Sequence, residues 1–259
     1  MNEQPDVGLA LHSLLKSQEA SLQAWAIEVL ASRGQLLRDV AMELLKHPDA
    51  QIVMAVLRSM PFLPWSGTSH ELPRLLADTR PEVREAAILA GMMSGVRAAW
   101  QACRKAVDAR TKVNRTSLVL LAIGGDERPL VRRLACSGVE EMREDALWAL
   151  SFSGRVEAAE ACLDFMEPGP MAALAGEAFN AITGLKLEGA YLKEAEEEES
   201  RPPLEEDLTR DLEPRPEDSL PVPEREAVAT WWTEVQKTLP VARATCVAAR
   251  SALRLCRRN

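Results

Sequence analysis

The sequence is poor in aromatic residues and lacks the short motifs that mark the common catalytic sites. Aromatic side chains make up 4% of the 259 residues, and Tyr191 is the only tyrosine. A recognition surface rich in aromatics is therefore not expected over most of the length. Neither a GxSxG nucleophile elbow nor a GxxxxGK phosphate loop occurs, which argues against hydrolases and nucleotide-binding proteins of those types.

Long apolar runs are also missing. No run approaches the roughly 18 residues that a membrane-spanning helix needs. The start of the chain, MNEQPDVGLALHSLLK, lacks the charged n-region and longer apolar stretch of a signal peptide. The five cysteines show no CxxC spacing, and the first three fall in expected helices, where a buried free thiol is the ordinary state. These features predict a reducing, cytoplasmic setting and no membrane partner.

An excess of charge of one sign is nearly absent outside one segment. The whole chain carries a net charge of -8, while the segment 194–218 alone has twelve acids and three arginines. The remainder is therefore close to neutral, unlike a polyanion-binding protein with its clustered basic excess. One local exception is 97–115, where six basic residues oppose Asp108. Those cations could hold phosphates, although a nucleic-acid partner is not expected.

One helical pattern repeats through most of the chain. Starting from Met142 in the stretch MREDALWALSFSG, apolar or small residues fall at positions zero, four, five, seven and eight, which is one face of a helix. The zero positions recur at intervals of 29 to 32 residues: Leu22, Ile52, Val83, Val113, Met142 and Leu174. Position four is always of modest size and position five always apolar. A period near 30 with one periodic helix per repeat predicts a helical solenoid.

Each repeat is expected to be a hairpin whose second helix carries the periodic positions. The first helices are predicted at about 6–16, 35–46, 69–78, 96–109, 127–136 and 155–166. The repeats end near Gly184. An acidic, proline-rich linker, 186–221, cannot offset the entropy of ordering and is predicted to be disordered. A C-terminal helical pair is predicted within 222–257, with helices at about 223–238 and 241–256.

Three stretches carry a family resemblance. The repeat DTRPEVREAAILAGMMSG (78–95) resembles HEAT repeats, particularly the short bacterial type named after phycobilisome lyases. Such repeats place an arginine after the valine, where it braces the neighbouring repeat, and Arg84 and Arg143 match that position. DALWALSFSGR (145–155), AGEAFNAITGL (175–185) and LPVPEREAVATWW (220–232) resemble an uncharacterised bacterial HEAT-repeat family. Some members are encoded beside type VI secretion components. The predicted fold is thus all-α, a right-handed α-solenoid of five to six HEAT-like hairpins over 6–185.

The candidate site follows from the helical face that points away from the core. Positions two and six of the second helices form this row: Glu28, Arg58, Glu85, Arg115, Glu144, Trp148 and Asn180. In HEAT arrays the second helices usually line the concave side, so the row is expected to face a partner. Trp148 among charges is a plausible hot spot. Trp231 and Trp232 point about 100° apart on a helix, so one is expected to dock its helix and the other to remain open to a partner.

The leading hypothesis is a non-enzymatic adaptor, chaperone or immunity-type protein that binds another protein, with no cofactor and no catalytic residue. The alternative is a bilin-lyase-like enzyme acting on a tetrapyrrole or similar ligand, in which Arg110, Lys112 and Arg115 would grip propionates. Metal catalysis has less support. The dipeptide His70-Glu71 is similar to the HE pairs of HEAT-repeat deoxyhypusine hydroxylases, but those enzymes need several such pairs to hold two irons. No metal site is predicted.

Overall fold

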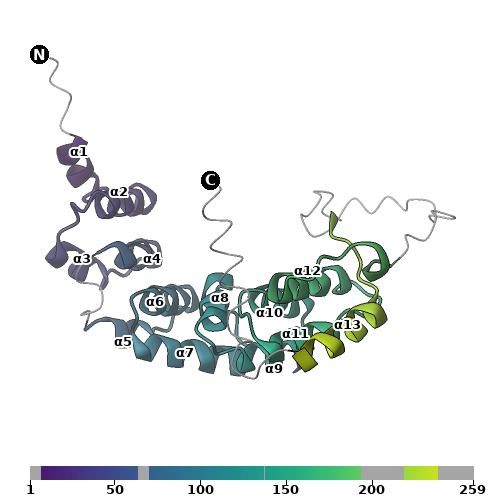
Figure 1. Ribbon diagram of the computed structural model, residues 1–259. Helices are drawn as coiled ribbons and strands as arrows, with labels where there is room; N and C mark the ends of the chain where they lie inside the picture. The colour runs from purple at the N-terminus through teal and green to yellow at the C-terminus, as the bar shows by residue number, and fades with distance from the viewer. Residues whose placement is uncertain (1–6, 64–69, 137, 194–218, 239–259) are drawn as a thin grey trace, which may run out of the picture. The chain divides into compact units, whose positions relative to one another are not determined.

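The computed structural model describes residues 7–63, 70–136, 138–193 and 219–238, and over these ranges the protein is helical (Figure 1). Thirteen α-helices and short 3-10 helices occur in the described ranges, with no strand and only an isolated bridge between Leu192 and Pro223. The all-α prediction is confirmed. The chain divides into two compact bodies, residues 1–120 and 121–259, which we describe one at a time.

The N-terminal body is a row of helix hairpins. Its first helices are α1 (Val7–Leu14), α3 (Arg38–Leu44) and α5 (Leu72–Leu75), and its second helices are α2 (Ala20–Ser32), α4 (Ala50–Ser59) and α6 (Pro81–Met93). Each first helix packs on the second helix that follows it. The second helices form one layer, because α4 packs on both α2 and α6 (Figure 1). The 3-10 helix η1 (Met60–Phe62) follows α4, and α7 (Arg97–Asp108) packs on α6.

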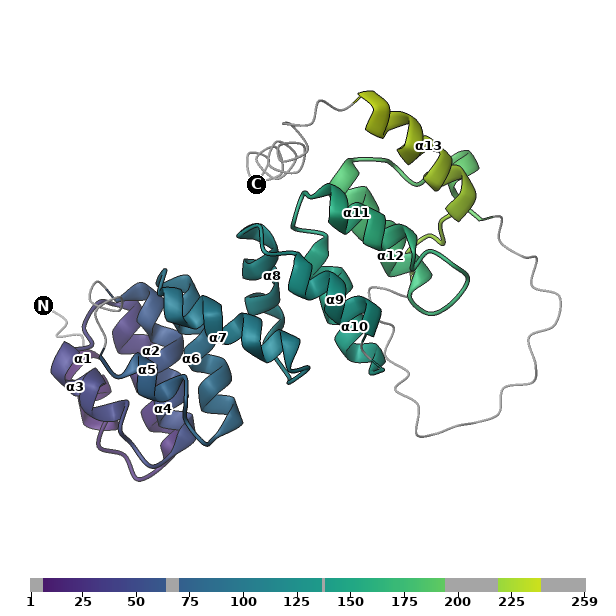
Figure 2. The same cartoon turned by 90° about the horizontal axis from the view of Figure 1, so that it is seen from below.

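The C-terminal body repeats the hairpin plan. It contains α9 (Arg128–Cys136), α10 (Glu140–Leu150), α11 (Val156–Leu163), α12 (Ala172–Thr183), η3 (Gly189–Tyr191) and α13 (Arg225–Thr238). Helix α9 packs on α10, α11 packs on α12, and the second helices α10 and α12 contact each other. The last helix, α13, lies against α11 and η3 (Figure 2). Helix α8 (Arg115–Ile123) contains the boundary between the two bodies.

Local sequence signals set the helix ends. Asp49 precedes α4 and its carboxylate accepts a hydrogen bond of 2.8 Å from the Gln51 backbone N–H, as a good N-cap does. Pro81 begins α6 at a position where its missing N–H costs nothing. Gly184 ends α12 in the left-handed conformation, with φ of 79°. The six first helices and six second helices fall where the repeat pattern predicts them.

The core is built from the predicted positions of the second helices. Position four is at most 1% exposed in all six repeats: Ala26, Val56, Ala87, Ser117, Ala146 and Ala178. Position five is at most 7% exposed: Ile27, Leu57, Ile88, Leu118, Leu147 and Phe179. The small side chain allows the next helix to approach, and the large one beside it fills the layer.

Position zero needs a correction at the first repeat. Leu22 was expected on the core face but is 41% exposed, whereas its equivalents Ile52 and Val83 are 1% and 0% exposed. The reason is that α2 belongs to the first hairpin of the row. In the described part of the chain, α4 is the one second helix that packs beside it, so its other side is uncovered. Trp25, one turn further along α2, is 54% exposed for the same reason.

Both ends of the expected disordered linker have defined conformations. Leu185 and Leu187 are buried, Lys193 N donates to Val222 O at 3.0 Å, and Glu224 N donates to Tyr191 O at 2.8 Å. These segments are ordered because their apolar side chains cover α12. The expected helix 223–238 corresponds to α13. The stretch 194–218 and the helix expected at 241–256 lie outside the described residues.

Gly176 marks the place where this cover meets α12. A Cβ built on Gly176 would lie 2.9 Å from Leu187 Cδ1 and 3.0 Å from Pro223 Cγ. Only a residue without a side chain permits this approach. The segments on either side of 194–218 are therefore packed on the last repeat helix and on each other.

Candidate partner-binding site

In the N-terminal body, the predicted outward row begins with an ion pair between neighbouring second helices. Arg58 on α4 places Nη2 2.7 Å from Glu28 Oε1 on α2, and its Nε donates to the same oxygen at 2.8 Å. Both side chains are about half exposed, at 50% and 42%, so the pair contributes little stability. Glu85 on α6 is half-buried and Arg115 at the start of α8 is exposed. One repeat of spacing thus places Glu28 and Arg58 side by side, as the row requires.

In the C-terminal body, the row residue Trp148 on α10 pairs with Phe152, which lies in the turn just after this helix. Trp148 is half-buried, and its ring meets that of Phe152 edge-on, with centroids 5.0 Å apart and an interplanar angle of 66°. Phe152 itself is 43% exposed. Glu144 lies one turn before Trp148 and is half-buried. Phe152 was not among the residues expected from the sequence, because it follows the end of α10 and lies outside the helical pattern.

Asn180 is the member of the row on α12. It is half-buried, and its Nδ2 donates to Glu177 Oε2 at 3.3 Å on the same helix. This contact lies within one turn and does not link two repeats. Asn180 therefore differs from Arg58, whose side chain reaches the neighbouring second helix.

Of the two adjacent tryptophans of α13, Trp232 is buried and Trp231 is half-buried. Trp232 is 6% exposed, and its ring lies edge-on to Phe179 of α12 at 5.4 Å. Trp231 is half-buried, 6.2 Å from Phe179 and stacked on Trp232 at 6.3 Å. The 100° between successive helical residues produces this division. Trp232 docks the helix, and Trp231 keeps an accessible side.

Polar contacts fix α13 in the same place. Arg225 Nε donates to the Leu163 carbonyl at the end of α11 at 3.2 Å, and Gln236 Nε2 donates to Glu160 Oε1 at 2.9 Å. The first contact satisfies one of the carbonyls that a helix end leaves open. Helix α13 is therefore held at both ends as well as through its aromatic side chains.

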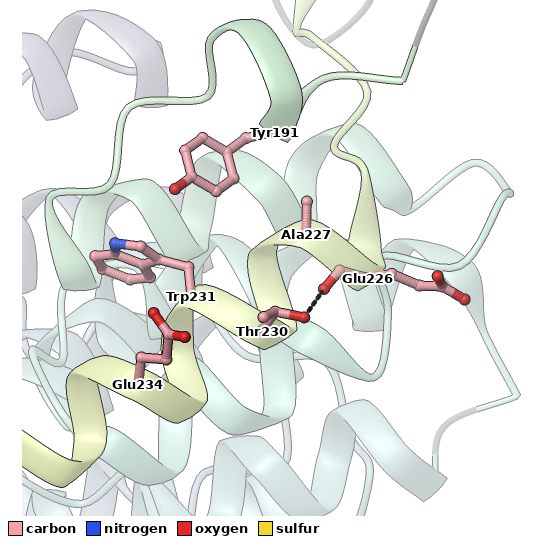
Figure 3. A pocket seen from close by; sticks show the side chains of 6 residues that line it. All are labelled: Tyr191, Glu226, Ala227, Thr230, Trp231 and Glu234. Carbon is pink, nitrogen blue, oxygen red and sulfur yellow. Dashed lines mark hydrogen bonds between the residues drawn. The ribbon is translucent and has the colours of Figure 1, made fainter.

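A pocket of about 370 Å³ lies between η3 and the accessible side of α13 (Figure 3). Its lining residues are Tyr191, Glu226, Ala227, Thr230, Trp231 and Glu234. Figure 3 shows the Tyr191 phenol directed toward Trp231, with the Glu234 carboxylate beside the indole. The Thr230 hydroxyl is already used, because Oγ1 donates to the Glu226 carbonyl at 2.8 Å. Of these residues, the sequence analysis singled out Trp231 alone.

The arginines of the N-terminal body mostly tie repeats together. Arg80 donates Nε and Nη2 to the two carboxylate oxygens of Asp78, each at 2.9 Å, and Nη1 to the Pro48 carbonyl of the preceding repeat at 2.9 Å. The hydrogen bond from Arg80 lowers the pKa of Asp78 to about 2, and the carboxylate in turn raises the pKa of Arg80. Arg74 Nη2 likewise donates to the Leu45 carbonyl at 2.9 Å.

Arg84 was predicted to brace the neighbouring repeat, but it binds within its own repeat. Its Nη1 donates to the carbonyls of Asp78 and Thr79, at 2.7 and 3.0 Å, which belong to the turn of its own repeat. The expectation is wrong there because that turn lies within reach of the first turn of α6. Arg143 instead faces the next repeat, in a second pocket of about 370 Å³ whose lining includes Asp164 and Glu167.

The residues considered for catalysis do not assemble into a site. Within the described ranges, no three His, Cys, Asp or Glu side chains come together in a way that could hold a metal ion. Glu71, of the His70-Glu71 dipeptide, is paired with Arg74 at 2.8 Å and with Lys46 at 3.9 Å. Cys103 and Cys162 are buried free thiols, and burial raises the pKa of Cys162, which disfavours the reactive thiolate.

The cations considered for the lyase alternative are exposed and do not line a pocket described above. Arg110, Lys112 and Arg115 are all exposed, and they line neither of the two pockets described above. No helix within the described ranges is both long and apolar enough to traverse a bilayer. Compared with known proteins, the chain matches no protein-family model and no curated protein sequence.

Proposed function

We propose that this protein is a non-enzymatic binding scaffold, a cytoplasmic α-solenoid of HEAT-like hairpins that holds another protein on the outward row of its second helices. The support is the 30-residue period, together with the burial of positions four and five in all six second helices. In each body, moreover, successive second helices pack side by side. Such arrays present long continuous surfaces, which is their usual role in binding.

The observation that carries the binding proposal is the aromatic pair Trp148 and Phe152. Large aromatic side chains near a surface gain free energy when a partner removes them from water, and they dominate protein interfaces. Phe152 remains 43% exposed although its ring contacts Trp148. Glu144, one turn away on the same helix, supplies a charge for the rim of such an interface.

The partner's class follows from the resemblance alone. HEAT-like proteins of the family named above include members encoded near type VI secretion components, so an adaptor, chaperone or immunity-type role in that system is the form of scaffold we propose. The tetrapyrrole-lyase alternative is not carried further, because no observation in the structure favours it.

Photo-crosslinking tests which face binds. Benzoylphenylalanine would replace Glu144 or Asn180 on the row, which leaves Trp148 in place, and, as a matched control, the exposed Glu157 on the first helix α11. We expect both row positions to crosslink to the same protein in cells and Glu157 not to do so. Crosslinks from Glu157 at equal yield, or none from either row position, would contradict the proposal.

A further inference from the structure

The pocket between η3 and α13 combines two aromatic walls with two carboxylates. We propose that it binds the guanidinium group of an arginine side chain. A guanidinium is flat and weakly hydrated, so it stacks on the faces of tryptophan and tyrosine, while its five N–H donors remain available at its edge. The rings of Trp231 and Tyr191 provide this combination with the carboxylate of Glu234 beside the indole, and Glu226 lines the pocket with its carboxylate farther from the rings.

Contacts within the protein hold the Trp231 ring and the backbone of Tyr191 before any ligand arrives. Trp231 is held by its stack on Trp232 and by the edge of Phe179. Tyr191 belongs to η3, whose backbone is held to the start of α13 by the hydrogen bond from Glu224 N to Tyr191 O at 2.8 Å. An indole that is already held in place loses little conformational entropy on binding.

The charges of the pocket favour a cation. Glu226 and Glu234 are both exposed, and no Lys or Arg lines the pocket. The nearest arginine on α13, Arg225, is turned to the Leu163 carbonyl and lies 3.4 Å from Glu167. An anion would meet two carboxylates and no donor of positive charge, while an uncharged ligand would gain nothing from them.

Arginine fits better than lysine for a geometric reason. The space of about 370 Å³ is open to solvent and bordered by the Trp231 and Tyr191 rings, on which a planar group can stack. An ammonium group is a compact, strongly hydrated charge and would give up water to gain the same contacts. Glu234 beside the indole can then accept from the edge of a stacked guanidinium.

Two sources can supply the arginine. The first is the chain's own segment 239–259, which carries five arginines and no acid and continues directly from α13. Arg243 follows Thr238, the last residue of α13, by five positions, and a ligand tethered this closely has an effective concentration on the order of millimolar. The second source is an arginine-rich segment of a partner, which rests on the proposed function.

The test uses the full chain labelled with ¹⁵N, titrated with L-argininamide as the probe. The indole N–H resonance of Trp231, assigned by its loss in Trp231→Phe, reports on the pocket. We expect a saturable shift with argininamide and none with the neutral isostere citrullinamide. Glu234→Gln should weaken the response several-fold, while Glu141→Gln, an exposed carboxylate on α10, should leave it unchanged.

A variant with all five arginines of 239–259 changed to glutamine separates the two sources. If the chain's own segment occupies the pocket, argininamide binds this variant several-fold more tightly than the wild type. If a partner supplies the arginine, the two proteins bind the probe equally. Equal shifts with argininamide and citrullinamide, or no shift in either protein, would overturn the guanidinium site. Because the titration needs no partner, its failure is independent of the crosslinking result for the scaffold.

Discussion

At the scale of single residues, the pair Asp78 and Arg80 joins one repeat to the next, since Arg80 also donates to the Pro48 carbonyl. Asp78→Asn should lower the free energy of unfolding at pH 7 by about 1.5–3 kcal/mol, the usual loss for a hydrogen bond to a charged group. Urea unfolding measures this change. The exposed Asp39→Asn in the first turn of α3 is the matched control and should cost no more than about 0.5 kcal/mol.

The same pair predicts a pH dependence. The pKa of Asp78 falls from its ordinary value of 3.8 to about 2 in the folded protein. A lowered folded pKa means that the ionised carboxylate stabilises the fold fully above pH 3.8, and that this contribution is lost as the pH falls toward 2. Asp78→Asn should lack this part of the acid sensitivity. Parallel stability curves for both proteins through that window would contradict the assignment.

Two leucine-sized side chains on α2 test the burial pattern. Ile27 is 0% exposed and Leu22 is 41% exposed. Ile27→Ala should destabilise the N-terminal body by about 2–5 kcal/mol, because it leaves a cavity. Leu22→Ala removes a side chain that is already partly in water and should cost less than about 1 kcal/mol. If thermal unfolding shows that both variants lose the same stability, the side of α2 that carries Leu22 is covered in solution and the burial pattern is wrong there.

At the scale of elements, the close approach at Gly176 should decide whether the segments around η3 stay on α12. Gly176→Val places methyl groups where Leu187 and Pro223 lie, and overpacking of this kind costs about 1–3 kcal/mol. We expect faster hydrogen exchange at the amides of Tyr191 and Glu224. Ala181→Val, at an exposed position of the same helix, is the control. Unchanged exchange in Gly176→Val would mean that the cover is not fixed there.

The repeat period predicted the helices well because each one is specified locally. Positions four and five of every second helix are buried as predicted, since a 3.6-residue period determines which side faces the core. The hydrogen-bond partners of Arg84 could not be predicted from its position after the valine. So long a side chain can contact the turn of its own repeat, as it does here, instead of the neighbouring repeat.

The pocket beside α13 was largely beyond the reach of sequence patterns. Glu226, Thr230, Trp231 and Glu234 share a side of one helix, so that half of the pocket was available from helical spacing. Tyr191 meets them across a long intervening segment, and such a contact is set by tertiary packing of Leu187 and Pro223 on Gly176. No local periodicity encodes that meeting.

At the scale of the whole molecule, the proposed function is that the outward row of the repeated hairpins binds a protein. The row is mixed in charge and contains a single aromatic residue, Trp148, whose ring contacts Phe152, which predicts an interface with a single dominant anchor. Removal of an interface hot spot typically costs about 2 kcal/mol or more, which is roughly a thirty-fold loss of affinity. Binding should therefore depend far more on Trp148 than on the exposed pair Glu28 and Arg58.

The most direct test is affinity purification from source-cell lysate with mass spectrometry. Wild-type protein is compared with a variant carrying Trp148→Ala and Arg115→Glu, after circular dichroism confirms that the variant keeps its helices. The account predicts one protein that co-purifies stoichiometrically with the wild type and is lost from the variant. The absence of any stoichiometric partner, or a partner retained equally by the variant, would contradict it.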